Sequence, residues 1–340
     1  MANPKVRFRF FEPEVDTNLP FTDGTVTIDG FDLECISGEA DAWDQGMGQL
    51  PGKLAAGEPI VCIPAFPNRK FRLAYIQVNA RAGIESAKDL EGKRVGIHFW
   101  GNTAGVWARG ALQNYYGVDL ARIDWRSANP TPPPNLPAGI TISPLPEYSG
   151  PTDRVMDPPL ADVRAGSQLL PQPGAADRFM DTLLVDGELD AVIGPNVLPS
   201  ITARDPRVRR LFRNYKDEEQ TYFKQTGIFP ISHVIAMDRG FVERYPAAPV
   251  ALLKAYRQAR DIAFERIEGS DPVVLTISWA AAAMAEQREL MGERYWAYNV
   301  ADNRRSLEAY TEFAQQQGLT PARLDYLSFF DPEAAALPGW

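Results

Sequence analysis

The order of apolar and polar positions predicts strands and helices that alternate along most of the chain. Short apolar runs predict strands at 6–11, 27–36, 40–43, 60–65, 72–78, 94–97, 191–194 and 233–237. Longer stretches with apolar residues every three or four positions predict helices at 103–116, 178–186, 240–245, 248–267, 276–291 and 303–317. This alternation is typical of an α/β protein, in which the helices of the last third would pack on a sheet built from earlier strands.

The segment 89–110 holds the most informative pattern, an apolar strand that leads through a short loop into a helix. Asn102 or Thr103 can cap this helix, and its apolar positions form one stripe: Ala104, Trp107, Ala108, Ala111, Leu112 and Tyr115. A helix N-terminus at the end of a strand offers unpaired N–H groups and partial positive charge. We therefore predict an anion site here, and the alternative is an ordinary strand–helix connection without a ligand.

The length of 340 residues predicts two lobes, because single compact cores are usually smaller. Twelve prolines fall between positions 130 and 173. Apolar residues recur among them, so we expect an ordered excursion on one lobe; the alternative is a disordered linker.

The net charge and the hydropathy of the chain argue against nucleic acids and membranes as binding partners. The 35 Lys and Arg against 44 Asp and Glu give a net charge of -9, which argues against a nucleic-acid partner. An anionic ligand would therefore need a few focused basic groups. No apolar run approaches the ~20 residues that span a bilayer, so no membrane partner is expected. Because no apolar signal region follows Met1, we expect a cytoplasmic protein; the alternative is a periplasmic protein whose signal peptide has been removed.

Cysteine, histidine and glycine motifs exclude several chemistries. Cys35 and Cys62 lie in strand-like runs and are expected to be buried small hydrophobes. The two histidines, His98 and His233, are too few for a His-rich metal site. Dinucleotide loop, P-loop and G-x-S-x-G patterns do not occur. We expect neither a metal nor a cofactor.

Several motifs resemble those of the 4,5-dihydroxyphthalate decarboxylase family. They are Ile-Pro-Ala-Phe-Pro-Asn-Arg-Lys-Phe-Arg at 63–72, Asp-Leu-Glu-Gly-Lys-Arg-Val-Gly at 89–96 and the run 103–110 followed by Tyr-Gly-Val at 116–118, with further agreement at 184–191, 227–233 and 299–310. The resemblance covers most of the chain as far as Leu319. It implies the two-lobed fold of type 2 periplasmic binding proteins, with a ligand cleft between the lobes. We expect lobe I at 1–95 and 205–340, and lobe II at 96–204 with the Pro-rich excursion 130–173.

The same resemblance and the residue types indicate candidate ligand-binding residues. Arg69 and Arg72 match the family motif, and a planar guanidinium can hold a carboxylate through two parallel hydrogen bonds. Alone, this run would be typical of a solvated turn. The other predicted substrate-binding residues are aromatic side chains, the helix end and an amide beyond the 191–194 strand: Trp43, Phe99, Trp100, Asn102, Thr103 and Asn196.

The expected function is a cofactor-independent decarboxylase of a hydroxylated aromatic carboxylate similar to 4,5-dihydroxyphthalate. An acid in the cleft would protonate the ring before carbon dioxide leaves. His98 is the first candidate for this acid and His233 the second, because imidazole titrates near neutral pH; Asp44 and Glu12 follow. Alternatives are a solute-binding protein for an aromatic acid, or another lyase or hydrolase on the same scaffold. The partner would be a small aromatic acid, and a homo-oligomer is left open.

Overall fold

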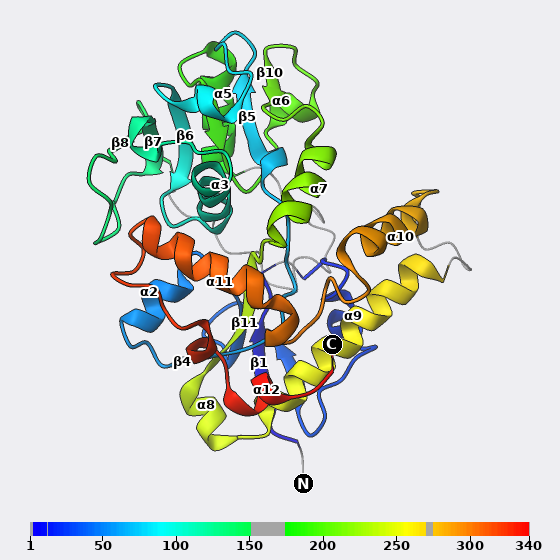
Figure 1. Cartoon of the computed structure of the whole chain (residues 1–340). Helices are drawn as coiled ribbons and strands as arrows, with labels where there is room; N and C mark the ends of the chain where they lie inside the picture. The colour runs from blue at the N-terminus through cyan, green and yellow to red at the C-terminus, as the bar shows by residue number, and fades with distance from the viewer. Residues whose placement is uncertain (1–2, 12, 151–173, 270–274, 340) are drawn as a thin grey trace.

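The computed structural model describes residues 3–11, 13–150, 174–269 and 275–339, which form two lobes with one β-sheet each. Figure 1 shows the lobes stacked, with β1 and α12 both in the lower one. The α/β prediction is confirmed. None of the described helices is long and apolar enough to cross a membrane.

The sheet of the first lobe has the strand order β2-β1-β3-β11-β4. Its strands are β1 (Lys5–Arg9), β2 (Asp32–Cys35), β3 (Ala42–Gly46), β4 (Ile60–Ile63) and β11 (His233–Asp238). Strand β1 runs parallel to β2 and β3, whereas β11 runs antiparallel to β3 and β4. A strand from late in the chain therefore lies between two early ones, which places distant residues side by side.

The sheet of the second lobe has the order β10-β5-β9-β6-β7-β8. Its strands are β5 (Ile76–Asn79), β6 (Arg94–Phe99), β7 (Asp124–Asn129), β8 (Ile142–Pro144), β9 (Ala191–Ile193) and β10 (Val208–Arg210). Strand β6 is parallel to both neighbours, β7 and β9, while β5 is antiparallel to β9 and β10. The sequence pattern predicted neither β7, β8 nor β10.

The second lobe is larger than the predicted range 96–204. Strands β5 and β10 pair at the far edge of its sheet, although we expected 1–95 and 205–340 to belong to the first lobe. The apolar alternation of β5 fits either sheet equally well, because only its partners decide where a strand lies. The chain therefore crosses between lobes in the segments that join β4 to β5 and β10 to β11.

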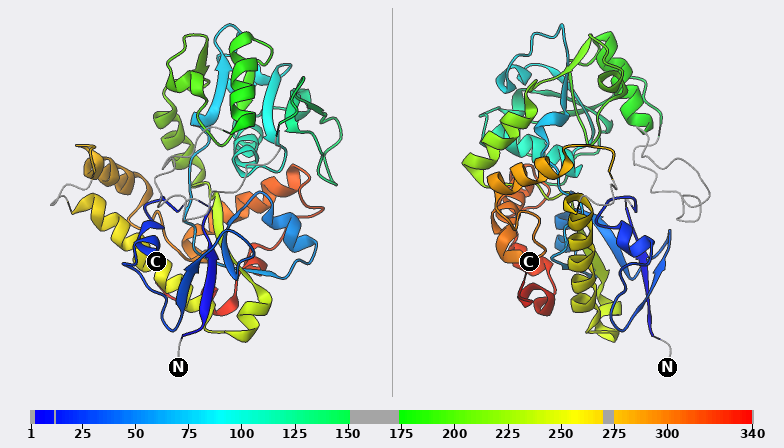
Figure 2. Two further views of the ribbon diagram at one scale, coloured as in Figure 1. Left: turned by 180° about the vertical axis from the view of Figure 1, so that it is seen from behind. Right: turned by 90° about the vertical axis from the view of Figure 1, so that its right-hand side faces the viewer.

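All six predicted helices are present, with ends shifted by a few residues. They are α3 (Thr103–Asn114), α5 (Ala175–Asp186), α8 (Arg239–Arg244), α9 (Ala248–Glu268), α10 (Ala280–Met291) and α11 (Val300–Gln316). The helices of the last third gather on the lower lobe, as predicted, and Figure 2 shows them from two further sides. The sequence pattern missed the helices α1 (Leu19–Thr22), α2 (Leu50–Ala55), α6 (Pro199–Thr202), α7 (Tyr215–Thr226) and α12 (Pro332–Ala336). Among these, α7 buries a single residue, Tyr222, so it carries no apolar stripe.

Helix α3 joins the two lobes through its predicted apolar stripe. Five of the six stripe residues are buried, and Tyr115 is half-buried. The Trp107 ring lies 5.2 Å from that of Tyr310 and 5.8 Å from that of Phe313, both on α11. Its Nε1 donates a 2.7 Å hydrogen bond to the Ile231 carbonyl. The lobes therefore share one continuous hydrophobic core.

The described part of the Pro-rich segment is ordered. Strand β8 pairs with β7, Leu145 is buried, and Leu136 and Ile140 pack against the core. Residues 151–173, on which the rest of that prediction falls, lie outside the described residues. Cys62 is buried as predicted, whereas Cys35 is only partly buried.

Candidate active site

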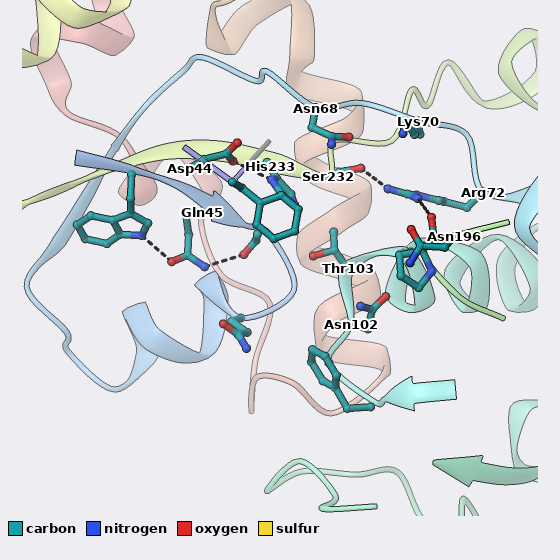
Figure 3. A pocket seen from close by; sticks show the side chains of 18 of the residues that line it. Asp44, Gln45, Asn68, Lys70, Arg72, Asn102, Thr103, Asn196, Ser232 and His233 are labelled. Carbon is teal, nitrogen blue, oxygen red and sulfur yellow. Dashed lines mark hydrogen bonds and ion pairs between the residues drawn. The ribbon is translucent and has the colours of Figure 1, made fainter. Parts of the chain in front are cut away.

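A cavity of about 410 Å³ lies between the two lobes (Figure 3). The first lobe contributes Arg9, Phe11, Trp43, Asp44, Gln45, Gly46, Gln49 and Lys53; the crossing segments and the start of β11 contribute Asn68, Lys70, Arg72, Ser232 and His233; the second lobe contributes Phe99, Gly101, Asn102, Thr103, Ala104, Pro195 and Asn196. Its size suits a small organic ligand.

Basic side chains dominate the charge of the cavity wall. Arg9, Lys53, Lys70 and Arg72 line it, and Asp44 is the single acidic residue among the lining residues of the described chain. The whole chain carries a net charge of -9, so this local excess of positive charge runs against the average. A concave wall of one sign raises the local concentration of ions of the opposite sign. The cavity is therefore suited to an anion.

His233 and Asp44 form a hydrogen-bonded pair on the floor of this cavity. Asp44 lies on β3 and His233 begins β11, and the register sets His233 opposite Gly46, two residues from Asp44. Alternate residues of a strand share a face, so both side chains point the same way. The His233 Nδ1 lies 2.7 Å from Asp44 Oδ1, and the Asp44 side chain is only 2% exposed. The centroids of the Phe11 ring and the imidazole are 4.5 Å apart, with the two rings at 71° to each other.

The second ring nitrogen of His233, Nε2, has no hydrogen-bond partner among the residues that the structure describes. A β-carbon at Gly46 would lie 3.9 Å from His233 Nε2 and 3.5 Å from Thr103 Oγ1. The glycine therefore keeps the space between the imidazole and helix α3 clear. With its Nδ1–H donated to Asp44, the imidazole can give or take a proton at Nε2.

The N-terminus of α3 forms another wall. Asn102, one of the two caps that the sequence predicts, accepts a 3.2 Å hydrogen bond from Gly105 N. Thr103 Oγ1 accepts a 2.7 Å bond from the backbone N–H of Gly48, so its hydroxyl proton is directed elsewhere. Both residues line the cavity, where the helix end adds partial positive charge.

Of the two arginines predicted to bind the substrate, Arg72 lines the cavity and Arg69 does not. Arg72 lines the cavity, donates to Ser232 Oγ and reaches the Pro195 carbonyl at 3.5 Å. Arg69 does not line it: its guanidinium donates to Asn303 Oδ1 at 2.6 Å and to the Phe229 carbonyl at 2.8 Å, which holds it in the first lobe. Burial lowers the pKa of Arg69 to about 9. The structure therefore does not bring Arg69 to the predicted carboxylate clamp.

The predicted aromatic residues separate in the same way. Trp43 and Phe99 line the cavity. Trp100 is 1% exposed, donates through Nε1 to the Gln317 carbonyl at 2.8 Å, and lies 4.0 Å from the guanidinium of Arg109. It therefore belongs to the core, because the turn after Phe99 directs it inward.

His98 lies behind the cavity wall and not on it. Residues 97 and 99 of β6 share one face of the strand, whereas residues 96 and 98 share the other, where a β-carbon at Gly96 would meet Met180 of α5. The His98 Nε2 lies 3.0 Å from Oδ1 of Asp177, also on α5. Asp177 Oδ2 in turn accepts a 2.8 Å bond from Asn196, which does line the cavity. Of the two histidines predicted as the acid, His233 therefore lines the cavity and His98 does not.

Several lining residues were not predicted, and Arg9, Gln45 and Lys53 are examples. Arg9 ends β1 and Gln45 lies near the end of β3, two parallel strands whose carboxyl ends meet at one edge of the sheet. This is where ligands bind in open α/β sheets, so the end of the first strand offered a signal for Arg9. Glu12 lies outside the described residues. Within the ranges that the structure describes, no three His, Cys, Asp or Glu side chains gather as a metal site.

Comparison with known sequences supports the resemblance. The model of the family described as NMT1/THI5 like matches residues 26–126. A protein of Comamonas testosteroni named 4,5-dihydroxyphthalate decarboxylase is 27% identical over 338 residues, which cover 93% of this chain and 94% of the relative. A protein of Pseudomonas putida with the same name is 28% identical over 219 residues, 60% of this chain and 76% of the relative.

Comparison with solved structures supports the fold. The periplasmic aliphatic sulphonate binding protein SsuA of Escherichia coli matches with a TM-score of 0.54 at 15% identity, covering 97% of this chain and 98% of that one. The desulfurization enzyme DSZB matches with a TM-score of 0.52 at 15% identity, covering 98% of each chain. The chain thus has the fold of type 2 periplasmic binding proteins, and its two curated relatives confirm the resemblance to the 4,5-dihydroxyphthalate decarboxylase family.

Proposed function

We propose that this protein is a carboxy-lyase that removes carbon dioxide from a hydroxylated aromatic carboxylate similar to 4,5-dihydroxyphthalate. The names of the two curated relatives support the reaction class. One observation on the chain itself carries the proposal: a buried Asp44 holds His233, through Nδ1, on the wall of a cavity that is also lined by four basic side chains. A basic cavity suits a carboxylate, and the imidazole supplies the proton that a decarboxylation consumes.

Substrate binding rests on charge and shape. Arg72, itself only 7% exposed, and the N-terminus of α3 at Thr103 are the groups best suited to hold a carboxylate. Trp43 and Phe99 offer ring faces or edges for the aromatic body of the ligand. Such contacts fix the ring with respect to His233.

The reaction needs one proton and releases one molecule of carbon dioxide. His233 Nε2–H gives its proton to the ring carbon that bears the leaving carboxylate, while electron density from a ring hydroxyl group ortho or para to that carbon supports the new C–H bond. The C–C bond to the carboxylate then breaks, its electron pair restores the aromatic ring, and carbon dioxide leaves. His233 regains a proton from solvent, so the net reaction is carboxylate plus proton to arene plus carbon dioxide.

Asp44 has a defined role in this scheme. Its carboxylate accepts from Nδ1–H, which keeps the imidazole in one orientation and stabilises the protonated ring before transfer. The protonated substrate ring itself takes up the electron pair that other decarboxylations pass to a cofactor. We therefore propose that the reaction needs no cofactor, and activity that survives exhaustive dialysis against a chelator is the expected result.

A solute-binding protein for an aromatic acid needs the same basic cavity and no proton donor. The two functions separate in one experiment, in which the purified protein is incubated with 4,5-dihydroxyphthalate, hydroxybenzoates and unsubstituted phthalate. Carbon dioxide is measured, and the aromatic product is identified by mass spectrometry. Stoichiometric release of carbon dioxide from a hydroxylated acid supports the carboxy-lyase. Tight binding by calorimetry with no carbon dioxide from any acid would contradict it.

A further inference from the structure

We propose that Asn196 selects a hydroxylated ligand through its side-chain oxygen, and that Asp177 and His98 are positioning residues that fix the amide in that orientation. The inference deepens the proposed function and rests on it for the aromatic carboxylate. It concerns the second lobe, whereas the proton donor His233 lies in the first.

The hydrogen bond between Asn196 and Asp177 determines which way the amide faces. The distance from Asn196 Nδ2 to Asp177 Oδ2 is 2.8 Å, and the same oxygen accepts from Gly174 N at 3.1 Å. Burial alone would raise the pKa of Asp177, but the hydrogen bond and charge of His98 and the bond from Asn196 lower it below its usual value. The carboxylate is therefore ionised and only accepts hydrogen bonds, so the amide nitrogen must face it.

His98 completes the support from the other side of the carboxylate. The Nε2 of His98 lies 3.0 Å from Asp177 Oδ1, and the Asp177 side chain is only 3% exposed. One oxygen of this buried carboxylate thus accepts two hydrogen bonds, and the other has the His98 imidazole as its neighbour. Loss of His98 would leave Oδ1 of this buried carboxylate without a polar neighbour in the described part of the chain, which is unfavourable in the interior, whereas Oδ2 would keep the bond from Gly174 without Asn196.

Two groups of the Asn196 side chain are left for a ligand, the oxygen Oδ1 and the second hydrogen of Nδ2, and the oxygen is the acceptor. Asn196 lines the cavity, and its backbone carbonyl accepts from Gln77 Nε2 at 3.1 Å, which anchors the residue from behind. Among the described residues no group donates to Oδ1. An acceptor on the cavity wall matches a donor on the ligand.

The charge of the cavity indicates which kind of hydrogen-bond donor the ligand offers to Asn196 Oδ1. Four basic side chains disfavour a ligand that carries an ammonium group. An anionic ligand with a hydroxyl group satisfies both the basic wall and the Asn196 acceptor. Figure 3 shows Asn196 close to Arg72, with Asp44 and Gln45 toward the opposite end, so a ligand that reaches Asn196 can extend toward His233.

The test compares two ligands with the same pair of carboxylates, 4,5-dihydroxyphthalate and phthalate, by calorimetry. All binding measurements use a His233→Gln background, so that no ligand is consumed. In this background we expect a preference for the hydroxylated ligand of about tenfold. Asn196→Leu should reduce this preference to near unity while the affinity for phthalate stays within about threefold, because phthalate offers no donor.

The positioning residues have their own variants. Asp177→Asn should lower the preference, because an amide at 177 allows Asn196 to rotate. Asp181→Asn, the same change one turn along α5 at a residue that binds Ser200, is the matched control and should keep the preference. His98→Gln, which retains a donor for Asp177, should keep the preference, whereas His98→Leu should lower it. A merely structural role would weaken both ligands equally.

An unchanged preference in Asn196→Leu would overturn the inference, even if the Asp177 and His98 variants failed to fold. Equal affinity of the His233→Gln background for both ligands would overturn it as well. The parent's turnover is measured separately with 4,5-dihydroxyphthalate. If Asn196→Leu lowers the preference but the parent releases no carbon dioxide, the inference is supported and the proposed function is contradicted. If the parent turns over the substrate but Asn196→Leu keeps the preference, the proposed function is supported and the inference is contradicted.

Discussion

His233 and Asp44, which are 189 positions apart in the chain, meet across two antiparallel strands with Nδ1 and Oδ1 2.7 Å apart. The chain has two histidines, and each faces an aspartate. Only His233 lines the cavity between the lobes; His98 and Asp177 lie behind Asn196. The first pair is therefore suited to proton transfer and the second to support of the wall.

Asp44→Asn tests the first pair. The amide keeps the size of the side chain but no longer stabilises a protonated imidazole, so we expect kcat to fall by ~10²–10⁴-fold while the affinity for the substrate changes little. Steady-state kinetics that separate kcat from KM give the measurement. Asp41→Asn, on the same stretch but bound to Arg7 outside the cavity, is the control and should leave kcat unchanged. A rise in KM with an unchanged kcat would instead assign Asp44 to substrate binding.

Arg72→Gln tests the buried cation of the cavity. Removing a charge that is 7% exposed should weaken the binding of an aromatic carboxylate by about 10–100-fold, whereas Lys70→Gln, at an exposed position, should cost less than about threefold. Calorimetry at low and high salt measures both, and higher salt should reduce the effect of Lys70→Gln further. Equal losses of affinity in Arg72→Gln and Lys70→Gln would contradict the prediction that the buried cation contributes more to ligand binding than the exposed one.

Glu219 predicts a pH dependence of stability. It accepts a 2.9 Å bond from Ala74 N, and burial raises its pKa from 4.5 to about 7, despite the nearby charges of Arg210 and Arg72. The folded state therefore binds more protons between these values, so the contribution of Glu219 to the free energy of unfolding falls as pH rises from about 4.5 to about 7.

Glu219→Gln should remove this dependence and stabilise the protein at pH 8 by on the order of 1 kcal/mol relative to the parent. Urea unfolding at pH 5 and pH 8 measures the difference. Asp217→Asn, exposed on the same helix, is the control. A variant less stable than the parent at pH 8 would contradict the assignment.

Gly110 predicts how tightly α3 and α11 pack. A β-carbon there would collide with the ring of Phe313, so Gly110→Ala should destabilise the protein by about 1–3 kcal/mol. Gly52→Ala, in α2 with open space around it, should instead stabilise the protein by about 0.5–1 kcal/mol. Denaturant unfolding compares the two, and an unchanged stability in Gly110→Ala would mean that Phe313 moves without cost.

Local periodicity was enough to predict α3, its cap at Asn102 and its place beside a cavity, because strand end, cap and apolar stripe are all neighbours in sequence. The lobe boundaries were wrong because β5 and β10 have no local feature that assigns them to one sheet. His98 ranked first as the acid because it follows a strand and precedes the cap. Which face of β6 is covered by α5 depends on contacts that the sequence does not display.

The same limit applies to Arg69 and Arg72, three residues apart in one motif. Arg69 donates hydrogen bonds to Asn303 and Phe229, which lie far along the chain, whereas Arg72 lines the cavity. Arg9, at the end of β1, and Lys53, in α2, join the same cavity from outside this motif. Residue types in the sequence were therefore enough to predict a basic site for an anion. Which of these residues line the cavity depends on contacts between segments that are far apart in the chain.

Carbon dioxide release from 4,5-dihydroxyphthalate, measured at saturating substrate for the parent, His233→Gln and His98→Gln, tests the central claim most directly. Gln fills a similar volume in each case, and in His98→Gln it still donates to Asp177. We predict that His233→Gln loses ~10²–10⁴-fold in kcat while it still binds the substrate, and that His98→Gln stays close to the parent. Full turnover by His233→Gln, or a loss confined to His98→Gln, would contradict the account.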